Sequence, residues 1–111
     1  MGELRIPASR PLDALSKLRQ SGEAISDNVL QRARAILSIL DKSNVSAPFI
    51  FPTDIGGVQF EWHGEKRELD IELSPANEKL SWVAFENGVA ELEGEANADE
   101  SSVLQLVKWL R

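Results

Sequence analysis

The stretch Ile50–Glu95 decides the fold, because it has the pattern of two consecutive β-hairpins. Val58-Gln-Phe-Glu-Trp62 and Glu68-Leu-Asp-Ile-Glu-Leu73 both alternate apolar and polar residues. Strict alternation predicts strands with one face buried and the other in water. The polar positions of both strands are rich in carboxylates, so the sequence predicts a sheet with an acidic surface.

Two short loops set the predicted registers. Gly64-Glu65 places glycine first, as a type II′ turn prefers, and Asn87-Gly88 is the strongest short hairpin signal. These loops predict cross-strand pairs of Trp62 with Arg67, Phe85 with Ala90, and Val83 with Leu92. The buried face is then expected to include Val58, Phe60, Leu69, Ile71, Val83, Phe85 and Leu92.

Apolar residues recur at helical spacing both before and after the two hairpins in the sequence. Ser26 is a good N-cap for a helix that continues to about Lys42, and Asn97-Ala-Asp-Glu opens a C-terminal helix. Residues 1–10 are expected to be irregular, residues 12–18 to form a short helix, and residues 47–52 to form a strand between two prolines. The predicted fold is a single α+β domain of residues 1–111. It has two N-terminal helices, a four- to five-stranded antiparallel meander and a C-terminal helix packed on the sheet.

Charge is divided unevenly along the chain. Residues 1–43 carry seven Lys or Arg and five Asp or Glu, a balance of +2, while residues 44–111 carry five and thirteen, a balance of −8. Because an acidic sheet repels a phosphate backbone, we expect no binding to nucleic acid. The absence of cysteine excludes disulfides and thiolate chemistry and fits a cytoplasmic location. No apolar run approaches the roughly 18 residues of a membrane span, so no membrane association is expected.

His63 is the only histidine, and it shares a predicted face with Glu61 and Glu68. An imidazole with two carboxylates could ligate a divalent metal, so the alternative function is a small metal-dependent hydrolase that uses the acidic sheet face. A histidine at a hairpin end is more often a solvated turn residue, and an open sheet face supplies no cleft to perturb carboxylate pKa values. We therefore expect no catalytic residue, no metal and no cofactor.

Trp82 lies among carboxylates in the predicted register. A large aromatic side chain rimmed by charges is typical of an interface anchor, and the other interpretation is that Trp82 belongs to the core. Like charges placed opposite each other, as predicted for Glu61 and Glu68, cost stability and favour a cationic partner. The sequence thus predicts a face that binds a basic or amphipathic protein, or a second copy of the chain. Its members are Trp82, Glu91, Glu93, Glu61, Asp70 and Glu72.

Three segments resemble a widespread family of small bacterial proteins: Gly56-Gly-Val-Gln-Phe-Glu-Trp-His63, Leu69-Asp-Ile-Glu-Leu73 and Glu93-Gly-Glu95. The layout is similar too, down to a C-terminal helix that ends near Trp109-Leu110. Members often carry a Trp-Asp-Gly-Tyr-like segment where this chain has Gly22-Glu-Ala-Ile25. The resemblance implies no established activity and a small accessory-type protein. It favours a partner-binding role. The function we expect is that of a non-enzymatic protein-binding accessory protein, for example the antitoxin- or immunity-like half of a two-gene bacterial pair.

Overall fold

The computed structural model describes residues 6–7, 25–43, 45 and 47–110. The predicted helix over residues 12–18 lies outside the described residues. Of the predicted irregular segment 1–10, only residues 6–7 are described, and they form a two-residue strand. Along the chain the elements are β1 (Ile6–Pro7), α2 (Asp27–Lys42), β2 (Phe49–Pro52), β3 (Val58–His63), β4 (Arg67–Leu73), β5 (Leu80–Glu86), β6 (Val89–Ala96) and α3 (Glu100–Lys108).

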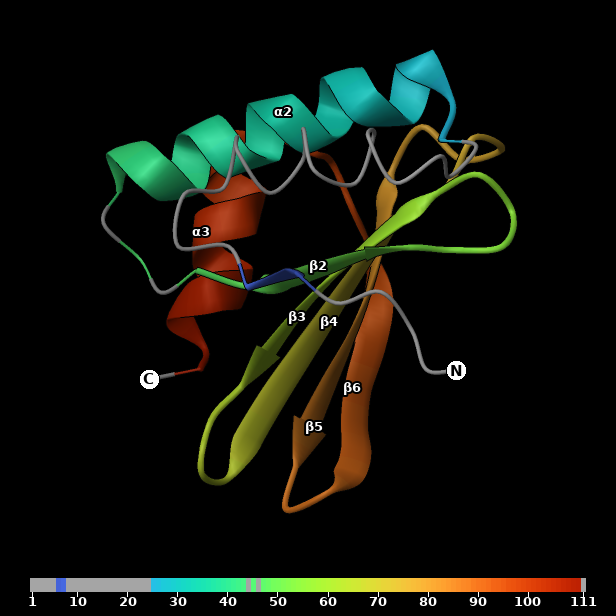
Figure 1. The fold of residues 1–111 in the computed structure, drawn as a ribbon. Coiled ribbons are helices and arrows are strands. Elements are labelled where there is room, and N and C mark those ends of the chain that lie inside the picture. The colour runs from blue at the N-terminus through green and yellow to red at the C-terminus, as the bar shows by residue number, and fades with distance from the viewer. Residues whose placement is uncertain (1–5, 8–24, 44, 46, 111) are drawn as a thin grey trace.

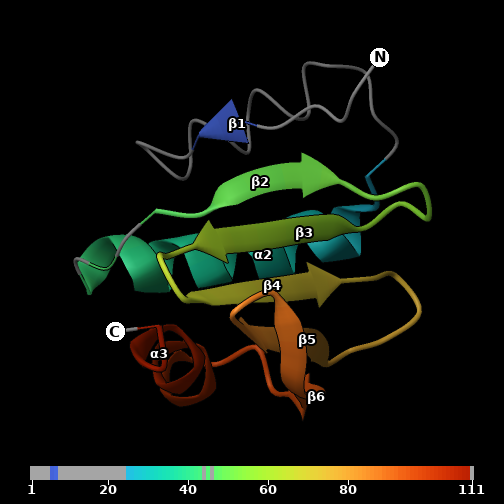
Figure 2. The same ribbon diagram turned by 90° about the horizontal axis from the view of Figure 1, so that it is seen from below.

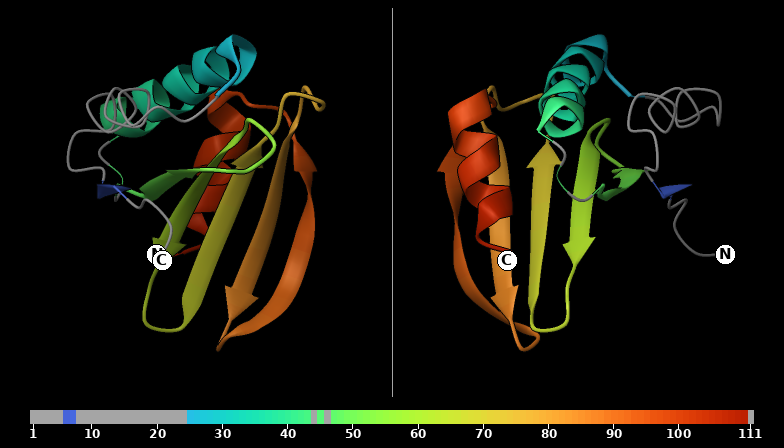
Figure 3. Two further views of the ribbon diagram at one scale, coloured as in Figure 1. Left: turned by 45° about the vertical axis from the view of Figure 1, so that its right-hand side comes forward. Right: turned by 90° about the vertical axis from the view of Figure 1, so that its left-hand side faces the viewer.

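The strands form one antiparallel sheet in the order β1-β2-β3-β4-β5-β6, so each strand pairs with its neighbours in the chain (Figures 1 and 2). Short connections between antiparallel strands permit this arrangement. Both described helices pack on the same side of the sheet (Figure 3). An α+β fold with an antiparallel meander is therefore confirmed, with β2–β6 as the five longer strands and β1 added at one edge.

Helix α2 forms as its sequence predicts. The Ser26 hydroxyl accepts a hydrogen bond from the Val29 N–H at 3.2 Å, which caps the first turn. The helix ends at Lys42, where the Ser43 N–H donates to the Ile39 carbonyl. One stripe of the helix is buried at the expected helical spacing and consists of Val29, Leu30, Ala33, Ile36, Leu37 and Leu40.

The core lies between the helices and one face of the sheet. Helix α3 contributes Val103 and Val107, and the largest fully buried side chain is Phe60 at the centre of β3. Complete burial of a large apolar side chain stabilises a fold by about 1.5–3 kcal/mol. The buried apolar residues of β3 and β4 alternate along each strand and comprise Val58, Phe60, Trp62, Leu69, Ile71 and Leu73.

The first hairpin differs in register from the prediction. The Gly64 N–H donates to the Arg67 carbonyl at 2.8 Å, so the loop is Glu65-Lys66, and Trp62 pairs with Leu69 rather than with Arg67. A loop displaced by one residue moves the pairing by two, and a shift of two keeps every side chain on its own face. The predicted burial of the apolar residues in β3 and β4 is therefore confirmed despite the wrong register.

The second hairpin has the predicted register next to its loop and a different register beyond it. Asn87 and Gly88 have φ values of 55° and 81°, as a type I′ turn requires, and Phe85 pairs with Ala90. A β-bulge then shifts the register by one, so Ala84 rather than Val83 pairs with Leu92. Glu91 is the extra residue of this bulge.

The neighbouring strand β4 decides which face of β5 is buried. Leu69 pairs with Ala84 and Ile71 pairs with Trp82, so the even-numbered residues of β5 join the buried face. The predicted burial of Val83 and Phe85 in this core is wrong, because both are half-buried on the opposite face. Leu92 does lie on the helix side, but 56% of its surface is exposed.

Helix α3 is held at both ends. At its C-terminal end the Arg67 guanidinium lies 4.7 Å from the centroid of the Trp109 ring and donates to the Trp109 carbonyl at 2.7 Å. At its N-terminal end the Asp99 carboxylate caps the helix by accepting from the Ser102 N–H at 2.9 Å.

The Asp99 cap predicts a pH-dependent stability. Hydrogen bonds from the backbone and then the side chain of Ser102 lower the pKa of Asp99 below its ordinary value. A lowered folded-state pKa stabilises the fold above the unfolded pKa of about 3.9, and this contribution is lost as the pH falls through the folded pKa. We therefore expect the urea midpoint of the wild type to fall more steeply than that of Asp99→Asn between about pH 5 and pH 3. Asn also caps helices, so a constant difference between the two proteins over this range would contradict the expectation.

Candidate functional site

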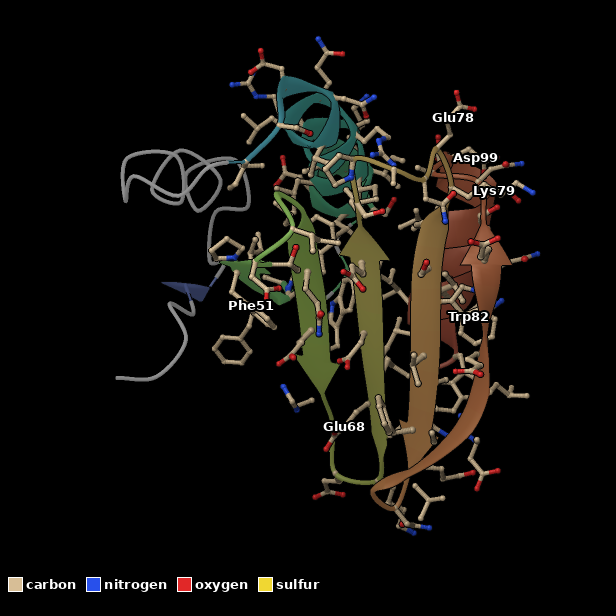
Figure 4. The ribbon with its side chains drawn as sticks, turned by 90° about the vertical axis from the view of Figure 1, so that its right-hand side faces the viewer. Phe51, Glu68, Glu78, Lys79, Trp82 and Asp99 are labelled. Carbon is tan, nitrogen blue, oxygen red and sulfur yellow. The ribbon has the colours of Figure 1, made fainter. Side chains whose placement is uncertain are left out.

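The face of the sheet opposite the two helices carries most of the strand carboxylates (Figure 4). We call this surface the outer face. It carries no Lys or Arg at the strand positions of β2–β6. These positions are Phe49, Phe51, Gln59, Glu61, His63, Glu68, Asp70, Glu72, Ser81, Val83, Phe85, Ala90, Glu93 and Glu95.

Cross-strand pairing arranges the outer face in rows. The central row runs from Phe49 through Glu61, Asp70 and Val83 to Glu93. In these rows β5 lies between β4 and β6, which carry the carboxylates. Val83 and Phe85 are the apolar residues of β5 on the outer face, and together they form an apolar strip. Carboxylates of β3 and β4 lie on one side of this strip and those of β6 lie on the other.

Glu61 is a buried carboxylate, with 7% of its surface exposed. It accepts hydrogen bonds from Gln59 Nε2 at 3.1 Å and from His63 Nε2 at 3.0 Å. These bonds offset the cost of removing a charge from water. Asp70 is the cross-strand partner of Glu61, so the outer face places like charges directly opposite each other at its centre.

The structure brings together the three residues of the predicted metal alternative. His63 Nε2 lies 3.0 Å from Glu61 Oε1, and His63 Nδ1 lies 3.7 Å from Glu68 Oε2. The two ring nitrogens therefore face different carboxylates. The imidazole also packs against the Phe49 ring in a T-shaped arrangement, with the ring centroids 6.1 Å apart. Within residues 6–7, 25–43, 45 and 47–110, no group of three or more His, Cys, Asp or Glu side chains is arranged to hold a metal ion.

Trp82 lies on the helix side of the sheet, not among the glutamates of the outer face (Figure 4). It pairs with Gly94, and a Cβ atom at Gly94 would lie 3.2 Å from Trp82 Cζ2, so the indole covers this glycine. A glycine inside a strand often marks such a close approach, and that signal was present in the sequence. The predicted face is corrected accordingly: Glu61, Asp70, Glu72 and Glu93 share the outer face, Glu91 is the bulge residue, and Trp82 is on the other side.

A groove of about 370 Å³ lies beside Trp82, between the sheet and α3. We call it the β6–α3 groove. The sequence pattern does not reveal this groove, because Leu92 reaches this side of the sheet only through the bulge at Glu91. Its lining is mainly apolar and comprises Leu69, Trp82, Ala84, Leu92, Glu95, Ala96, Ser102, Gln105, Leu106 and Trp109.

Arg32 is a further residue whose role the sequence did not reveal. Its guanidinium donates hydrogen bonds to the carbonyls of Asn77 and Ser74 at 2.6 and 2.5 Å. These contacts tie the β4–β5 connection to α2. Arg32 therefore has a structural role, and its charge is directed at carbonyl groups within the chain.

No family model, no curated protein and no solved structure matches the chain. None of the described helices is long and apolar enough to cross a membrane. What the protein does must therefore follow from the chemistry of its own surfaces, of which the outer face and the β6–α3 groove are the most distinctive.

Proposed function

We propose that the protein is a non-enzymatic accessory protein that binds a basic or amphipathic protein partner on its outer face. The observation that carries this proposal is that the charged strand residues beside the apolar strip formed by Val83 and Phe85 are acidic on both sides, on β4 and on β6. An apolar centre within a polar rim is the usual composition of a protein interface. Here the rim is acidic, so complementary partners are basic.

Electrostatics inside the free protein supports the same partner. Glu61 and Asp70 face each other across β3 and β4, and Glu72 and Glu68 flank them on β4. Carboxylates gathered on one face of a sheet attract a protein surface of the opposite charge. A surface with one sign of charge also accelerates the encounter with an oppositely charged protein and makes the association rate depend on salt.

An enzyme is the weaker proposal, because acid–base chemistry requires a site that holds the substrate and adjusts the pKa of the catalytic groups. His63 and its neighbouring carboxylates lie on the outer face. The β6–α3 groove lies on the opposite side of the sheet, next to Trp82 and Trp109. The sheet thus separates His63 and its neighbouring carboxylates from the groove.

The resemblance of Gly56–His63 to small bacterial accessory proteins supports a specific form of the proposal. In this form the chain is the antitoxin- or immunity-like half of a two-gene pair in the cytoplasm. Its partner is the basic or amphipathic product of the adjacent gene, and neither nucleic acid nor a membrane takes part in the contact.

Paired charge reversals test the proposal. Glu72→Lys with Glu93→Lys changes the outer face, while Asp54→Lys with Glu78→Lys changes exposed loops. Each double variant raises the net charge by four, from −6 to −2, so bulk charge is matched. We expect the outer-face variant to slow association with the adjacent-gene product by about tenfold at low salt, and the loop variant by less than about twofold. Surface plasmon resonance measures the association rate of each double variant and of the wild type. Equal effects of the two variants, or no binding by the wild type, would overturn the proposal.

A further inference from the structure

β6 is the last strand of the sheet, with β5 on one side and no described strand on the other. An edge strand presents unpaired backbone N–H and C=O groups along its free side. β6 spans the eight residues Val89–Ala96, which is long for an edge. Such an edge is a template for an added strand from another chain.

Two large apolar side chains are exposed on this strand. Val89 is 64% exposed and Leu92 is 56% exposed. Leu92 also lines the β6–α3 groove, so the groove reaches the strand at the edge of the sheet. Alternate side chains of a strand added to β6 would point toward the helix side, where the groove can receive an apolar group.

The charges of β6 restrict which strand can be added. Glu93 and Glu95 occupy outer-face positions of the strand, and Glu91 occupies the bulge between them and the hairpin loop. Glu95 also borders the β6–α3 groove and accepts a hydrogen bond from Asn77 Nδ2 at 2.5 Å. Pairing of β6 with β6 of a second copy would bring these carboxylates close to one another, which is unfavourable. A segment with Lys or Arg at alternate positions would instead place its cations beside Glu93 and Glu95.

We propose that β6 binds an extended, basic segment of the partner protein as an additional strand of the sheet. Alternate cationic side chains of this segment lie on the outer side, next to Glu93 and Glu95. An apolar side chain on its other face enters the β6–α3 groove beside Leu92. This inference rests on the proposed function and adds the mode of binding: main-chain hydrogen bonds supply affinity, and the groove and the carboxylates supply specificity.

A pair of synthetic peptides separates strand addition from electrostatic adhesion. The first is a short peptide that alternates lysine and valine, and the second has the same sequence with two successive backbone amides N-methylated. Methylation keeps the charge and removes a hydrogen-bond donor from each edge of the peptide strand. We expect methylation to weaken binding to the wild-type protein by at least about tenfold, measured by fluorescence anisotropy.

Hydrogen exchange supplies the second readout. The unmethylated peptide should slow amide exchange within residues 89–96, because the free side of β6 becomes hydrogen-bonded. Equal affinities of the two peptides would overturn strand addition and leave the proposed function standing, since the outer face would then bind by charge alone. Absence of binding by both peptides would overturn the inference, while the adjacent-gene experiment tests the proposed function separately.

A matched pair of variants tests the contact with the groove. Leu92→Ser removes the apolar wall at β6, and Ile55→Ser removes an equally exposed aliphatic side chain, 60% exposed, from the β2–β3 loop. We expect Leu92→Ser to weaken peptide binding by about tenfold and Ile55→Ser by less than about twofold. Urea midpoints of both variants show that the fold is retained. Equal affinities of the two variants would contradict the placement of an apolar side chain in the groove.

Discussion

Replacing Phe60 with alanine should lower the free energy of unfolding by about 3–5 kcal/mol, the usual cost of removing a buried aromatic ring. Phe60 is fully buried at the centre of β3, where it pairs with Ile50 and Ile71, and its ring lies 6.4 Å from that of Trp62. The surrounding strands hold their backbones by ladder hydrogen bonds, so they cannot close the cavity that the substitution leaves.

Phe85→Ala is the matched control, because the same atoms are removed from the opposite face. Phe85 is half-buried on the outer face, so we expect a loss of only about 1 kcal/mol. Urea unfolding of the two variants with a shared m-value measures the difference. The sequence alone predicted that both phenylalanines are core residues, so equal losses would support that earlier assignment and contradict the structure.

Replacing Trp82 with alanine should destabilise the isolated protein by about 2–4 kcal/mol. Its indole packs against the core, covers Gly94 and forms one wall of the β6–α3 groove. Trp82→Phe should retain most of the stability, because a smaller ring still covers the glycine. The measurement is the urea midpoint of each variant without any partner.

The outcome for Trp82→Ala separates two roles for this residue. An anchor on the acidic face, as the predicted register implied, would leave the isolated fold nearly as stable as the wild type. A residue on the helix side, as the structure places it, destabilises the fold directly. A midpoint for Trp82→Ala within experimental error of the wild type would therefore contradict the position described for Trp82.

The sequence predicted β3 and β4 well because their alternation is unambiguous. Apolar residues occupy only one parity in Val58–Trp62 and Leu69–Leu73, so the buried face was clear even though the loop was misplaced by one residue. The α2 helix was equally clear, since Ser26 and the apolar stripe agree on its start and its buried face. Local chemistry is sufficient wherever only one arrangement buries the apolar side chains.

β5 could not be predicted in the same way, because both of its faces are apolar. Leu80, Trp82 and Ala84 alternate with Val83 and Phe85, so periodicity favours neither set. Pairing with β4 makes the choice, and that register depends on contacts between residues distant from the hairpin loop. The bulge at Glu91 was hidden as well, since Glu91-Leu-Glu-Gly-Glu95 alternates as a regular strand does.

The candidate site, like the fold, could be predicted only in part from the sequence. The carboxylates of the outer face were predicted because β3 and β4 were assigned to the correct faces. The apolar strip of Val83 and Phe85 and the groove were not, because both follow from the β4–β5 register and the bulge. The proposed interface therefore depends on which side of β5 points outward.

Thiol labelling of single-cysteine variants tests most directly which side of β5 points outward, since the wild-type chain contains no cysteine. Val83→Cys places a thiol on the outer face, and Ala84→Cys places one at a position that is 2% exposed on the helix side. We expect Val83→Cys to react with a thiol reagent at least about a hundredfold faster than Ala84→Cys, because the thiol of Ala84→Cys becomes accessible only on local unfolding. Faster labelling of Ala84→Cys than of Val83→Cys would contradict the assignment of the outer face and, with it, the proposed binding surface.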